Sequence, residues 1–394
     1  GYLWSGRMRK LPSRAFREFT HSLEVDRALA LYDIRGSIAH ARMLAACRII
    51  SRSEGARIVR GLERIRKEIC AGTFQFAPTD EDIHTAVERR LVELCGEAGR
   101  KLHTARSRND QIVLDEKLYL KDVAGAIGTG IAGLQRALVS RAEELCPAVM
   151  PAYTHLQHSQ PVLVSHVLLA YVEMLERDRQ RLVDCLSRAD VLPLGACACC
   201  GTSLPIDPRI VARELGFSRI ASNSIDAVSD RDYFLEMASA LAILMGHLSR
   251  ISEDFILWST DEFGFLELPE EFCTGSSMMP QKKNPDLLEL IRGKAAAAVG
   301  AMTGLFALMK GLPLSYNRDL QEDKRPLFEM AENARRSLLL LADLVAKVGF
   351  ARDRMEAAAG RGCILATDLA EYLVRKGVAF REAHGICAGI VRHC

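Results

Sequence analysis

Residues 275–286 concentrate groups that can bind an anion and transfer a proton. The segment reads GSSMMPQKKNPD, with one glycine, two serine hydroxyls and two lysine ammonium groups. Its last residues predict a helix with Asn284 as the N-cap and Pro285 in the first turn. Because a helix N-terminus and loop amides favour negative charge, a carboxylate or a phosphate would suit this place. The alternative interpretation is a mobile surface loop that ends in a helix cap.

Two further polar segments carry groups suited to acid–base chemistry and to anion recognition. Residues 153–158 include His155 at an expected loop-to-helix junction, and a histidine can give or take a proton near neutral pH. A purely structural histidine is the alternative there. Residues 104–111 place Arg108 and Asn109 before an apolar helix, where guanidinium and amide groups can bind a carboxylate. A solvated helix cap explains that segment equally well.

Three other clusters have a weaker chemical interpretation. Residues 80–84 read DEDIH and form either a set of metal ligands or, more simply, the acidic start of a helix. Residues 316–324 crowd together hydrogen-bonding groups that a bound amino acid or guanidinium would need. Cys197, Cys199 and Cys200 lack the second cysteine or histidine pair of a zinc site, so we expect reduced thiols in a cytosolic protein.

The elements that must position these segments are helical. Aromatic residues are only 6% of the chain, and no segment alternates in the manner of a strand. Apolar spacing and breaker residues predict helices over residues 24–48, 53–70, 80–94, 111–145, 160–190, 226–258, 285–310 and 326–348. The helix from 160 would carry Pro161 in its first turn. Five long helices joined by polar loops predict a bundle.

Charge, motifs and hydropathy exclude several classes of function. The chain has 394 residues with 52 Lys plus Arg and 50 Asp plus Glu, so the net charge of +2 gives no sign of a nucleic-acid partner. The Walker pattern does not occur, and the one G-x-G-x-x-G, at residues 128–133, lies inside an expected helix and not between a strand and a helix, so it does not indicate a dinucleotide site. No apolar run reaches the length of a membrane span, and the first ten residues lack the apolar core of a signal peptide. We therefore expect a cytoplasmic protein that binds neither nucleic acid nor membrane.

Taken together, these loops resemble the signature regions of the fumarase/aspartase superfamily. Residues 275–285 match that superfamily's diagnostic GSSxMPxKxNP motif, and the resemblance extends over essentially the whole chain. Within the superfamily, ARSRNDQ at 105–111, DLQEDK at 319–324 and LWSGR at 3–7 are similar to the argininosuccinate lyase family. One departure follows LPLG, where the family usually has glycine, serine and alanine and this chain has ACACC at 196–200.

The resemblance implies an all-α fold, a long-helix bundle flanked by smaller helical domains. The expected domains are an N-terminal helical domain at 1–103, a central five-helix bundle at 104–350 and part of a C-terminal helical domain at 351–394. The resemblance also implies a homotetramer. The predicted helix lengths agree with a homotetramer. A helix over 111–145 is roughly 50 Å long, so the loops at its two ends lie too far apart to meet within one chain. We therefore expect active sites that are shared between antiparallel subunits.

The same resemblance implies a reversible β-elimination that cleaves argininosuccinate into arginine and fumarate. Ser276 would be the base, although the sequence leaves open which of Ser276 and His155 takes the proton and which gives it. Glu289 would pair with His155 and orient it. Lys282 would help to ionise Ser276 and, with Asn284, would bind the carboxylates on the fumarate side.

Further positions match substrate-contacting residues of the family. They are Ser22, His84, Arg108, Asn109, Thr154, Tyr316, Gln321 and Lys324. The implied substrate is a small molecule, and the implied reaction requires no metal and no organic cofactor.

Two other functions remain open from the sequence. Another enzyme of the superfamily would act on adenylosuccinate or on a different succinyl-amine. A non-enzymatic relative would keep the bundle for structural or binding use, as some lens crystallins of this family do. The presence of all four catalytic side chains, Ser276, His155, Lys282 and Glu289, argues against that last alternative.

Overall fold

The computed structural model describes residues 13–394, so the LWSGR segment at 3–7 lies outside the described residues. Contacts divide the chain into two compact units, each assembled from three stretches of sequence. Unit 1 comprises residues up to 126, 182–239 and 300–331, and unit 2 comprises 127–181, 240–299 and 332–394. The expected division into three domains at 103 and 350 stays a prediction.

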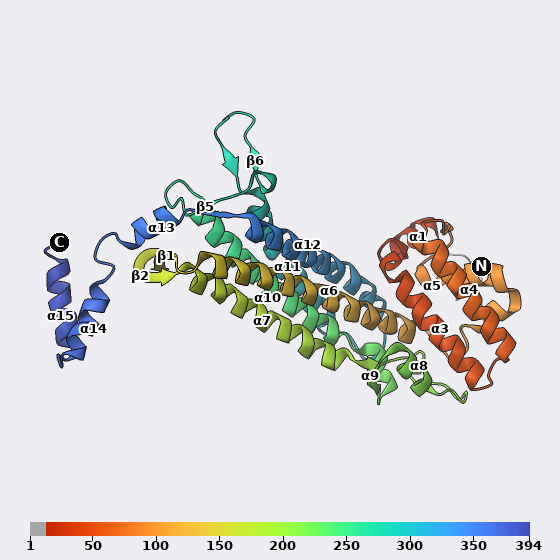
Figure 1. Ribbon diagram of the computed structural model, residues 1–394. Coiled ribbons are helices and arrows are strands. Elements are labelled where there is room, and N and C mark those ends of the chain that lie inside the picture. The colour runs from red at the N-terminus through yellow and green to blue at the C-terminus, as the bar shows by residue number, and fades with distance from the viewer. Residues whose placement is uncertain (1–12) are drawn as a thin grey trace. The chain divides into compact units, whose positions relative to one another are not determined.

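Unit 1 contains mostly short and medium helices (Figure 1). They are α1 (Arg14–Thr20), α2 (Leu23–Asp26), α3 (Ala30–Ala46), α4 (Arg52–Cys70), α5 (Ile83–Cys95), α8 (Pro208–Leu215), α9 (Ser224–Ser229) and the 3-10 helices η2 (Arg27–Leu29), η3 (Gly96–Lys101) and η5 (Arg318–Asp323). The two-residue strands β3 (Val191–Leu192) and β4 (Arg219–Ile220) pair in parallel.

Five long helices each contribute residues to both units. They are α6 (Arg108–Leu145), α7 (Val164–Ala189), α10 (Asp232–Trp258), α11 (Asp286–Met309) and α12 (Lys324–Lys347). The predicted helical bundle fold is thereby confirmed, with helix ends that differ from the expected ones by a few residues.

Unit 2 adds short antiparallel strand pairs, one 3-10 helix and three C-terminal α-helices. The strand pairs are β1 (Val149–Thr154) with β2 (Gln157–Leu163), β5 (Leu266–Glu267) with β8 (Gly349–Phe350), and β6 (Thr274–Gly275) with β7 (Lys283–Asn284). The helices are η4 (Glu270–Phe272), α13 (Arg352–Ala359), α14 (Ala366–Arg375) and α15 (Phe380–Val391).

Helices α3, α4 and α5 pack together in the apolar core of unit 1. A capping box starts α4, because Ser51 Oγ accepts a bond from the Glu54 amide and the Glu54 carboxylate accepts one from the Ser51 amide at 2.9 Å. Gly61 lets α4 approach α5 closely, since a Cβ there would lie 2.6 Å from Cys95 Sγ. Local caps and small residues therefore fix how these helices meet.

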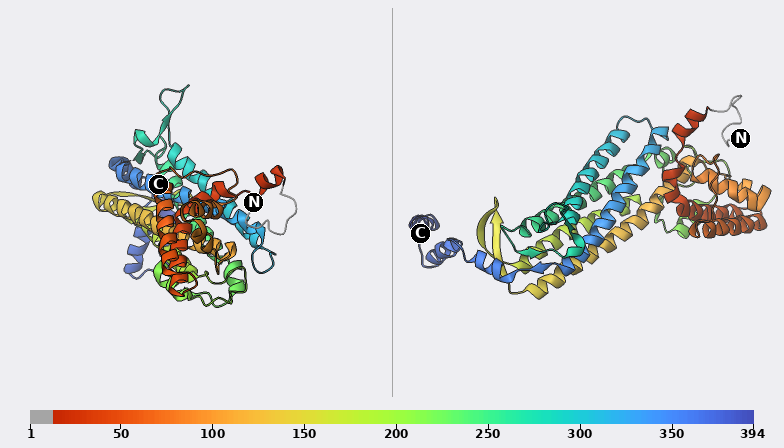
Figure 2. Two further views of the ribbon diagram at one scale, coloured as in Figure 1. Left: turned by 90° about the vertical axis from the view of Figure 1, so that its right-hand side faces the viewer. Right: turned by 90° about the horizontal axis from the view of Figure 1, so that it is seen from above.

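The unit 2 segments of the five long helices run side by side (Figure 1, Figure 2). Polar bonds join neighbours: Tyr171 of α7 donates to Asp254 of α10 at 2.7 Å, and Lys294 of α11 donates to Asn333 of α12 at 2.8 Å. Fully buried apolar side chains fill the space between these segments, among them Ile131, Leu134, Leu175, Leu248 and Leu341. This bundle is the scaffold from which the loops of unit 2 extend.

Among residues 13–394, only α10 is long and apolar enough to cross a membrane by length and composition. Of its apolar window, 56% is buried inside the protein. Phe255 is fully buried, and Asp254 and Glu253 bond to neighbouring helices. These are the properties of a core helix of the bundle.

The β1–β2 hairpin corrects the expectation of an uninterrupted helix from residue 160. Pro161 lies in β2 opposite Pro151, and α7 begins only after it. A two-stranded ribbon of this kind has both faces partly exposed, so burial does not alternate along it. The two prolines, which lack a backbone donor, further disguise the strand pattern. The sequence therefore predicted a helical turn where the chain forms a strand.

A buried group of charges joins α6, α10 and η5 inside unit 1. Arg231 Nε lies 2.6 Å from Asp323 Oδ2 and 3.2 Å from Glu116 Oε2, and the Tyr233 hydroxyl donates to the same Glu116 oxygen at 2.6 Å. The Arg231 side chain is only 1% exposed. Its charge is therefore balanced by protein carboxylates and not by water.

We predict that Arg231→Ala lowers the free energy of unfolding by about 3–5 kcal/mol, because two carboxylates are left buried without their cation. Chemical denaturation followed by circular dichroism measures this change. The matched control is Arg188→Ala, which removes a pair with Glu236 from a side chain that is 60% exposed and should cost under about 1 kcal/mol. Equal effects of the two substitutions would contradict the prediction.

His40 is held in its neutral form beneath the segment that precedes α6. Its Nε2–H donates to the Thr104 carbonyl at 2.8 Å, and the ring is fully buried. Burial, with a smaller effect of Arg106, lowers the pKa of His40 to about 3. The ordinary histidine pKa of about 6.5 applies after unfolding, so the unfolded chain binds this proton more readily.

We predict that this histidine makes the protein less stable in mild acid. Above pH 6.5 neutral His40 does not lower the free energy of unfolding. As the pH drops from 6.5 toward 3, its titration lowers the free energy of unfolding by up to about 1.4 kcal/mol per pH unit. His40→Gln keeps a donor for Thr104 but cannot titrate, so its stability should fall less steeply between pH 6.5 and 5. Denaturant midpoints against pH test this, with the exposed His393→Gln as control. Parallel curves for wild type and His40→Gln would refute it.

Candidate active site

Ser276 directly follows β6 in a hairpin that projects from the helices of unit 2 (Figure 1). Its Oγ accepts bonds from the backbone amides of Met278 at 3.2 Å and Met279 at 3.0 Å. Donors that point at an oxygen stabilise its charged form, so this turn favours loss of the hydroxyl proton. Lys282, later in the same loop, is exposed and supplies a cation on this hairpin.

The helix cap after this loop differs by one residue from the sequence prediction. Helix α11 begins at Asp286, and the Pro285 carbonyl accepts bonds from the Leu288 and Glu289 amides at 3.0 and 3.2 Å. Pro285 therefore occupies the cap position that was expected for Asn284. Pairing with β6 holds Asn284 extended, and its amide lies 3.4 Å from Thr274 Oγ1.

Glu289 lies in the first turn of α11 and is accessible to solvent. Its carboxylate is 49% exposed and 3.5 Å from Arg292, whose guanidinium also bonds to Glu253. The proposed partnership of Glu289 with His155 stays a prediction. A half-exposed carboxylate can still accept a bond from a group that approaches from outside.

His155 and Thr154 occupy the exposed turn of the β1–β2 hairpin and not a loop-to-helix junction. His155 and Leu156 have φ values of +55° and +57°, which is the left-handed region. That conformation costs roughly 1–2 kcal/mol for each non-glycine residue, so having His155 and Leu156 in this turn destabilises the fold. The hairpin presents the imidazole to solvent while Tyr153 packs against Phe263.

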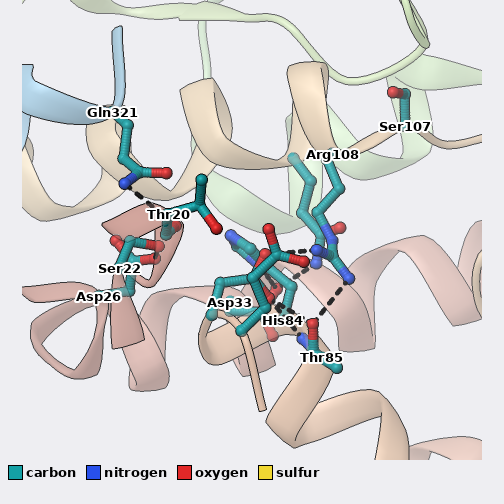
Figure 3. Close-up of polar contacts among 12 residues, drawn as sticks. Thr20, Ser22, Asp26, Asp33, His84, Thr85, Ser107, Arg108 and Gln321 are labelled. Carbon is teal, nitrogen blue, oxygen red and sulfur yellow. Dashed lines mark hydrogen bonds and ion pairs between the residues drawn. The ribbon is translucent and has the colours of Figure 1, made fainter. Parts of the chain in front are cut away.

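The other predicted substrate-binding residues gather in unit 1. They are Ser22, His84, Arg108, Asn109, Tyr316, Gln321 and Lys324, whereas Thr154, His155, Ser276, Lys282, Asn284 and Glu289 belong to unit 2. Figure 3 shows several of the unit 1 side chains meeting between helices that are distant in sequence. Each unit therefore holds its own part of the predicted site.

One group of contacts in unit 1 surrounds the start of α2. Ser22 donates to Asp26, while Gln321 donates to the Thr20 carbonyl at 3.3 Å (Figure 3). Lys324 Nζ lies 3.6 Å from Asp26 Oδ1 and is almost fully buried. Burial alone would lower the pKa of Lys324, but Asp323 and Asp26 raise it above its ordinary value. The lysine is therefore a fixed positive charge beneath this group.

Tyr316 lies half-buried in the loop before η5. Burial raises the pKa of its phenol, although Lys324 and Arg318 oppose this effect. The side chain therefore stays a neutral hydroxyl, which can both donate and accept a hydrogen bond.

A second group of contacts lies at the start of α6. Arg108 donates to Asp82 and, at 3.2 Å, to Thr85 Oγ1, which ties α6 to the start of α5. Asn109 donates to the Ala198 carbonyl at 3.0 Å and remains half-buried. Together these residues present a guanidinium and an amide, the pair that the sequence predicted for carboxylate recognition.

His84 lies between two buried carboxylates that the sequence analysis missed. Its Nδ1 is 3.1 Å from Asp33 Oδ1 and 3.6 Å from Asp115 Oδ2. Burial would raise the pKa of Asp33, but His84 and Arg106 lower it, whereas burial together with Asp33 raises the pKa of Asp115. Asp33 is therefore the ionised acceptor of the Nδ1 proton, and the buried Nε2 has no protein partner.

These three side chains are also the ones that could hold a metal. The ligand atoms of Asp33, His84 and Asp115 lie within 4.8 Å of one another, the only such group among residues 13–394. A hydrogen bond from the imidazole to ionised Asp33 accounts for the close approach without an ion. His84 Nε2 and Asp115 Oδ1 are buried without a hydrogen-bond partner and remain available to a polar ligand or to water.

Asp33 and Asp115 could have been found from the sequence by their setting. Each is an acid flanked on its N-terminal side by large apolar or aromatic residues in an expected helix, within LYDIRG and VLDEKLYL. Such a residue must find a partner when the helix packs, so it marks a buried polar cluster. The partner itself comes from α5, and periodicity within one helix does not identify it.

Comparison with known proteins shows which lyases the chain resembles. The family described as Lyase matches residues 6–300, and the family described as Argininosuccinate lyase C-terminal matches residues 363–394. The argininosuccinate lyase of Moorella thermoacetica is 53% identical over 392 residues, which is 100% of this chain and 84% of that protein. That of Syntrophobacter fumaroxidans is 52% identical with the same coverage. Among solved structures, an EDDS lyase in complex with formate is 30% identical, has a TM-score of 0.84, and is matched over 94% of this chain and 73% of its own.

Proposed function

Since the chain belongs to the argininosuccinate lyase family, we propose that it catalyses the reversible cleavage of argininosuccinate into arginine and fumarate, the last step of arginine biosynthesis. The observation that carries this proposal is the identity of 53% over the entire chain. The side chains proposed for such an elimination are distributed over both units. Release of fumarate from argininosuccinate by the purified protein, followed by ultraviolet absorbance, is the direct test.

The reaction removes a proton from a carbon next to a carboxylate and breaks the neighbouring carbon–nitrogen bond. Ser276 is the proposed base, because its Oγ already faces two backbone amides that stabilise an alkoxide. Removal of the proton places negative charge on the substrate carboxylate. Lys282 and Asn284, on the same hairpin, would bind that growing charge.

The leaving guanidino nitrogen needs a proton as the bond breaks. His155 is the proposed acid, since an exposed imidazole on a hairpin turn can reach a substrate from outside its own chain. Glu289 would orient it, and Thr154 beside it would bind the substrate. The arrangement gives the base and the acid separate hairpins, so each can approach one end of the scissile bond.

The residues of unit 1 are proposed to bind the rest of the substrate. Argininosuccinate carries carboxylates and a guanidinium, so its site must offer both signs of charge. Arg108 and Lys324 offer the cations, and Asp26, whose Oδ1 lies 3.6 Å from Lys324 Nζ, offers an anion. His84 presents a buried, unpartnered Nε2 that can bond to the ligand.

We further propose a cytoplasmic homotetramer in which subunits share active sites. The proposed proton-transfer groups belong to unit 2, and most proposed binding groups belong to unit 1. One subunit can therefore contribute the proton-transfer groups of a site while another contributes the binding groups. The long helices also expose apolar side chains that assembly would cover, among them Leu169, Leu290, Val299, Phe306 and Leu339.

A second activity deserves a parallel assay because an EDDS lyase shares the fold at 30% identity. That comparison favours a different succinyl-amine as an alternative substrate. Fumarate release from such an amine, compared with release from argininosuccinate at equal concentration, separates the two.

We predict that Ser276→Ala lowers kcat by about a hundred- to ten-thousandfold, the usual loss when a proton-transfer group is removed. Steady-state fumarate release measures it, with circular dichroism to show that helicity is unchanged. Ser277→Ala is the matched control, since that neighbouring hydroxyl is exposed. Turnover of Ser276→Ala within about tenfold of wild type would exclude Ser276 as the base.

We predict that subunit exchange between Ser276→Ala and Asn109→Ala restores part of the activity. If a site takes its hairpins from one subunit and its unit 1 residues from another, some mixed sites contain both wild-type parts. The control pair is Ser276→Ala with Lys282→Ala, which damages the same loop and should not recover. No gain in activity after exchange has been verified by mass spectrometry would argue against shared sites.

We predict that the Ser276 loop becomes more protected when ligand binds. Met278 is 87% exposed and the loop cations lack an anion, so a bound dicarboxylate should order residues 275–279. Hydrogen exchange with and without fumarate plus arginine measures this. Protection that is identical in both conditions would mean a preformed loop.

A further inference from the structure

The loop at residues 195–201 carries a pair of adjacent thiols. Cys199 Sγ and Cys200 Sγ lie 3.5 Å apart, both cysteines are free, and Cys200 is exposed while Cys199 is half-buried. This is the ACACC segment in which the chain departs from the glycine, serine and alanine usual in its family. The dithiol is therefore a feature of this chain that the proposed reaction does not use.

The separation of the two sulfurs suits a single bridging atom. A disulfide would bring them to about 2.05 Å, so they are not bonded. Two thiolates on one tetrahedral zinc, with Zn–S bonds of about 2.3 Å, would lie about 3.8 Å apart. Zinc needs four ligands, however, and within the described part of the chain no third His, Cys, Asp or Glu joins this pair. A bridging atom that needs only two sulfurs fits better.

We propose that Cys199 and Cys200 form a binding site for a trivalent arsenical, and that its occupancy weakens substrate binding through Asn109. An arsenic atom with one organic substituent completes its three bonds with two sulfurs. With phenylarsine oxide, two S–H bonds break, two As–S bonds form and the oxygen leaves as water. Arsenic remains trivalent throughout, so the step needs no oxidant or reductant.

The state of the thiols favours this condensation over oxidation by peroxide. The hydrogen bond with Cys199 raises the pKa of Cys200, and burial together with Asp110 raises the pKa of Cys197 to about 11. With its pKa raised, the Cys200 thiol keeps its proton near neutral pH, where attack on a peroxide requires the thiolate. Condensation with an arsenical consumes the thiol protons as it forms water.

The loop geometry couples the dithiol to the substrate site. The carboxylate of Asp110 accepts bonds from the amides of Gly195 at 3.1 Å and Cys197 at 2.7 Å, which fixes the loop upstream. The Gly201 amide closes the loop onto the Ala196 carbonyl at 2.9 Å. Any change in backbone conformation that follows when one atom bridges both sulfurs is therefore confined to residues 198–200.

Asn109 depends on that same short segment. Its amide donates to the carbonyl of Ala198, the residue next to Cys199, at 3.0 Å. A change in residues 198–200 removes or redirects this acceptor and frees the Asn109 side chain to rotate. This half of the inference rests on the proposed function, in which Asn109 binds the substrate.

The binding test does not depend on activity. Purified protein is treated with phenylarsine oxide, washed with excess glutathione, and examined by native mass spectrometry. A chelated arsenical survives a monothiol wash and is released by dithiothreitol, whereas adducts on single cysteines are lost in the wash. We expect one arsenical on wild type and on the control Cys70→Ser, whose thiol is exposed elsewhere in unit 1. Cys199→Ser and Cys200→Ser should retain none, and retention by either of them would overturn the site.

The kinetic test addresses the coupling. The adduct on wild type should raise KM for argininosuccinate roughly five- to tenfold, the effect of losing one hydrogen bond, with a smaller change in kcat. Dithiothreitol should reverse the change, and Cys200→Ser should be insensitive. An unchanged KM on a protein that carries the arsenical would overturn the coupling. If no preparation cleaves argininosuccinate, the proposed function fails, while the mass measurement still decides the dithiol site.

Discussion

The structure depends on keeping buried charges paired inside a helical interior. Arg231 meets two carboxylates from different helices, Lys324 lies against Asp26, and His84 lies against Asp33. Each partner comes from a separate stretch of the chain, so the helices of unit 1 can pack stably only in the arrangement that pairs them. Because an unpaired buried charge is very costly, the network acts as a set of constraints on helix register as much as a source of stability.

The same network contains groups that we propose bind the charged substrate. Fixed ammonium and guanidinium groups require no reorganisation when an anion arrives, which is where preorganised electrostatics are most effective. The proposed proton-transfer groups have the opposite setting, because Ser276 and His155 lie on hairpins at the surface of unit 2. In this proposal, buried charged groups bind the substrate and more exposed residues transfer the proton.

Much of this organisation could be predicted from the sequence, for reasons that differ between elements. The long helices follow from apolar spacing that persists over many turns, and GSSMMPQKKNPD marks a polar loop that leads into a helix, whose catalytic role stays a prediction. The β1–β2 hairpin was missed because Pro151 and Pro161 hide a pattern that burial does not reinforce. Asp33 and Asp115 were missed because their partner His84 comes from another helix, and a pairing in space leaves no periodic trace in one segment.

The discontinuous make-up of unit 1 has a consequence for how the chain is synthesised. Glu116 and its partners Arg231 and Asp323 are spread over about 200 residues, and the last stretch of the unit ends only at residue 331. A ribosome adding about 5–20 residues per second would take about 10–40 s to cover that interval. Throughout that time the buried charge on α6 lacks its partners from the later segments, so the charged part of unit 1 cannot pack. Unit 1 must therefore fold late and with many long-range contacts at once, a topology that slows folding and leaves the nascent chain reliant on protection from aggregation.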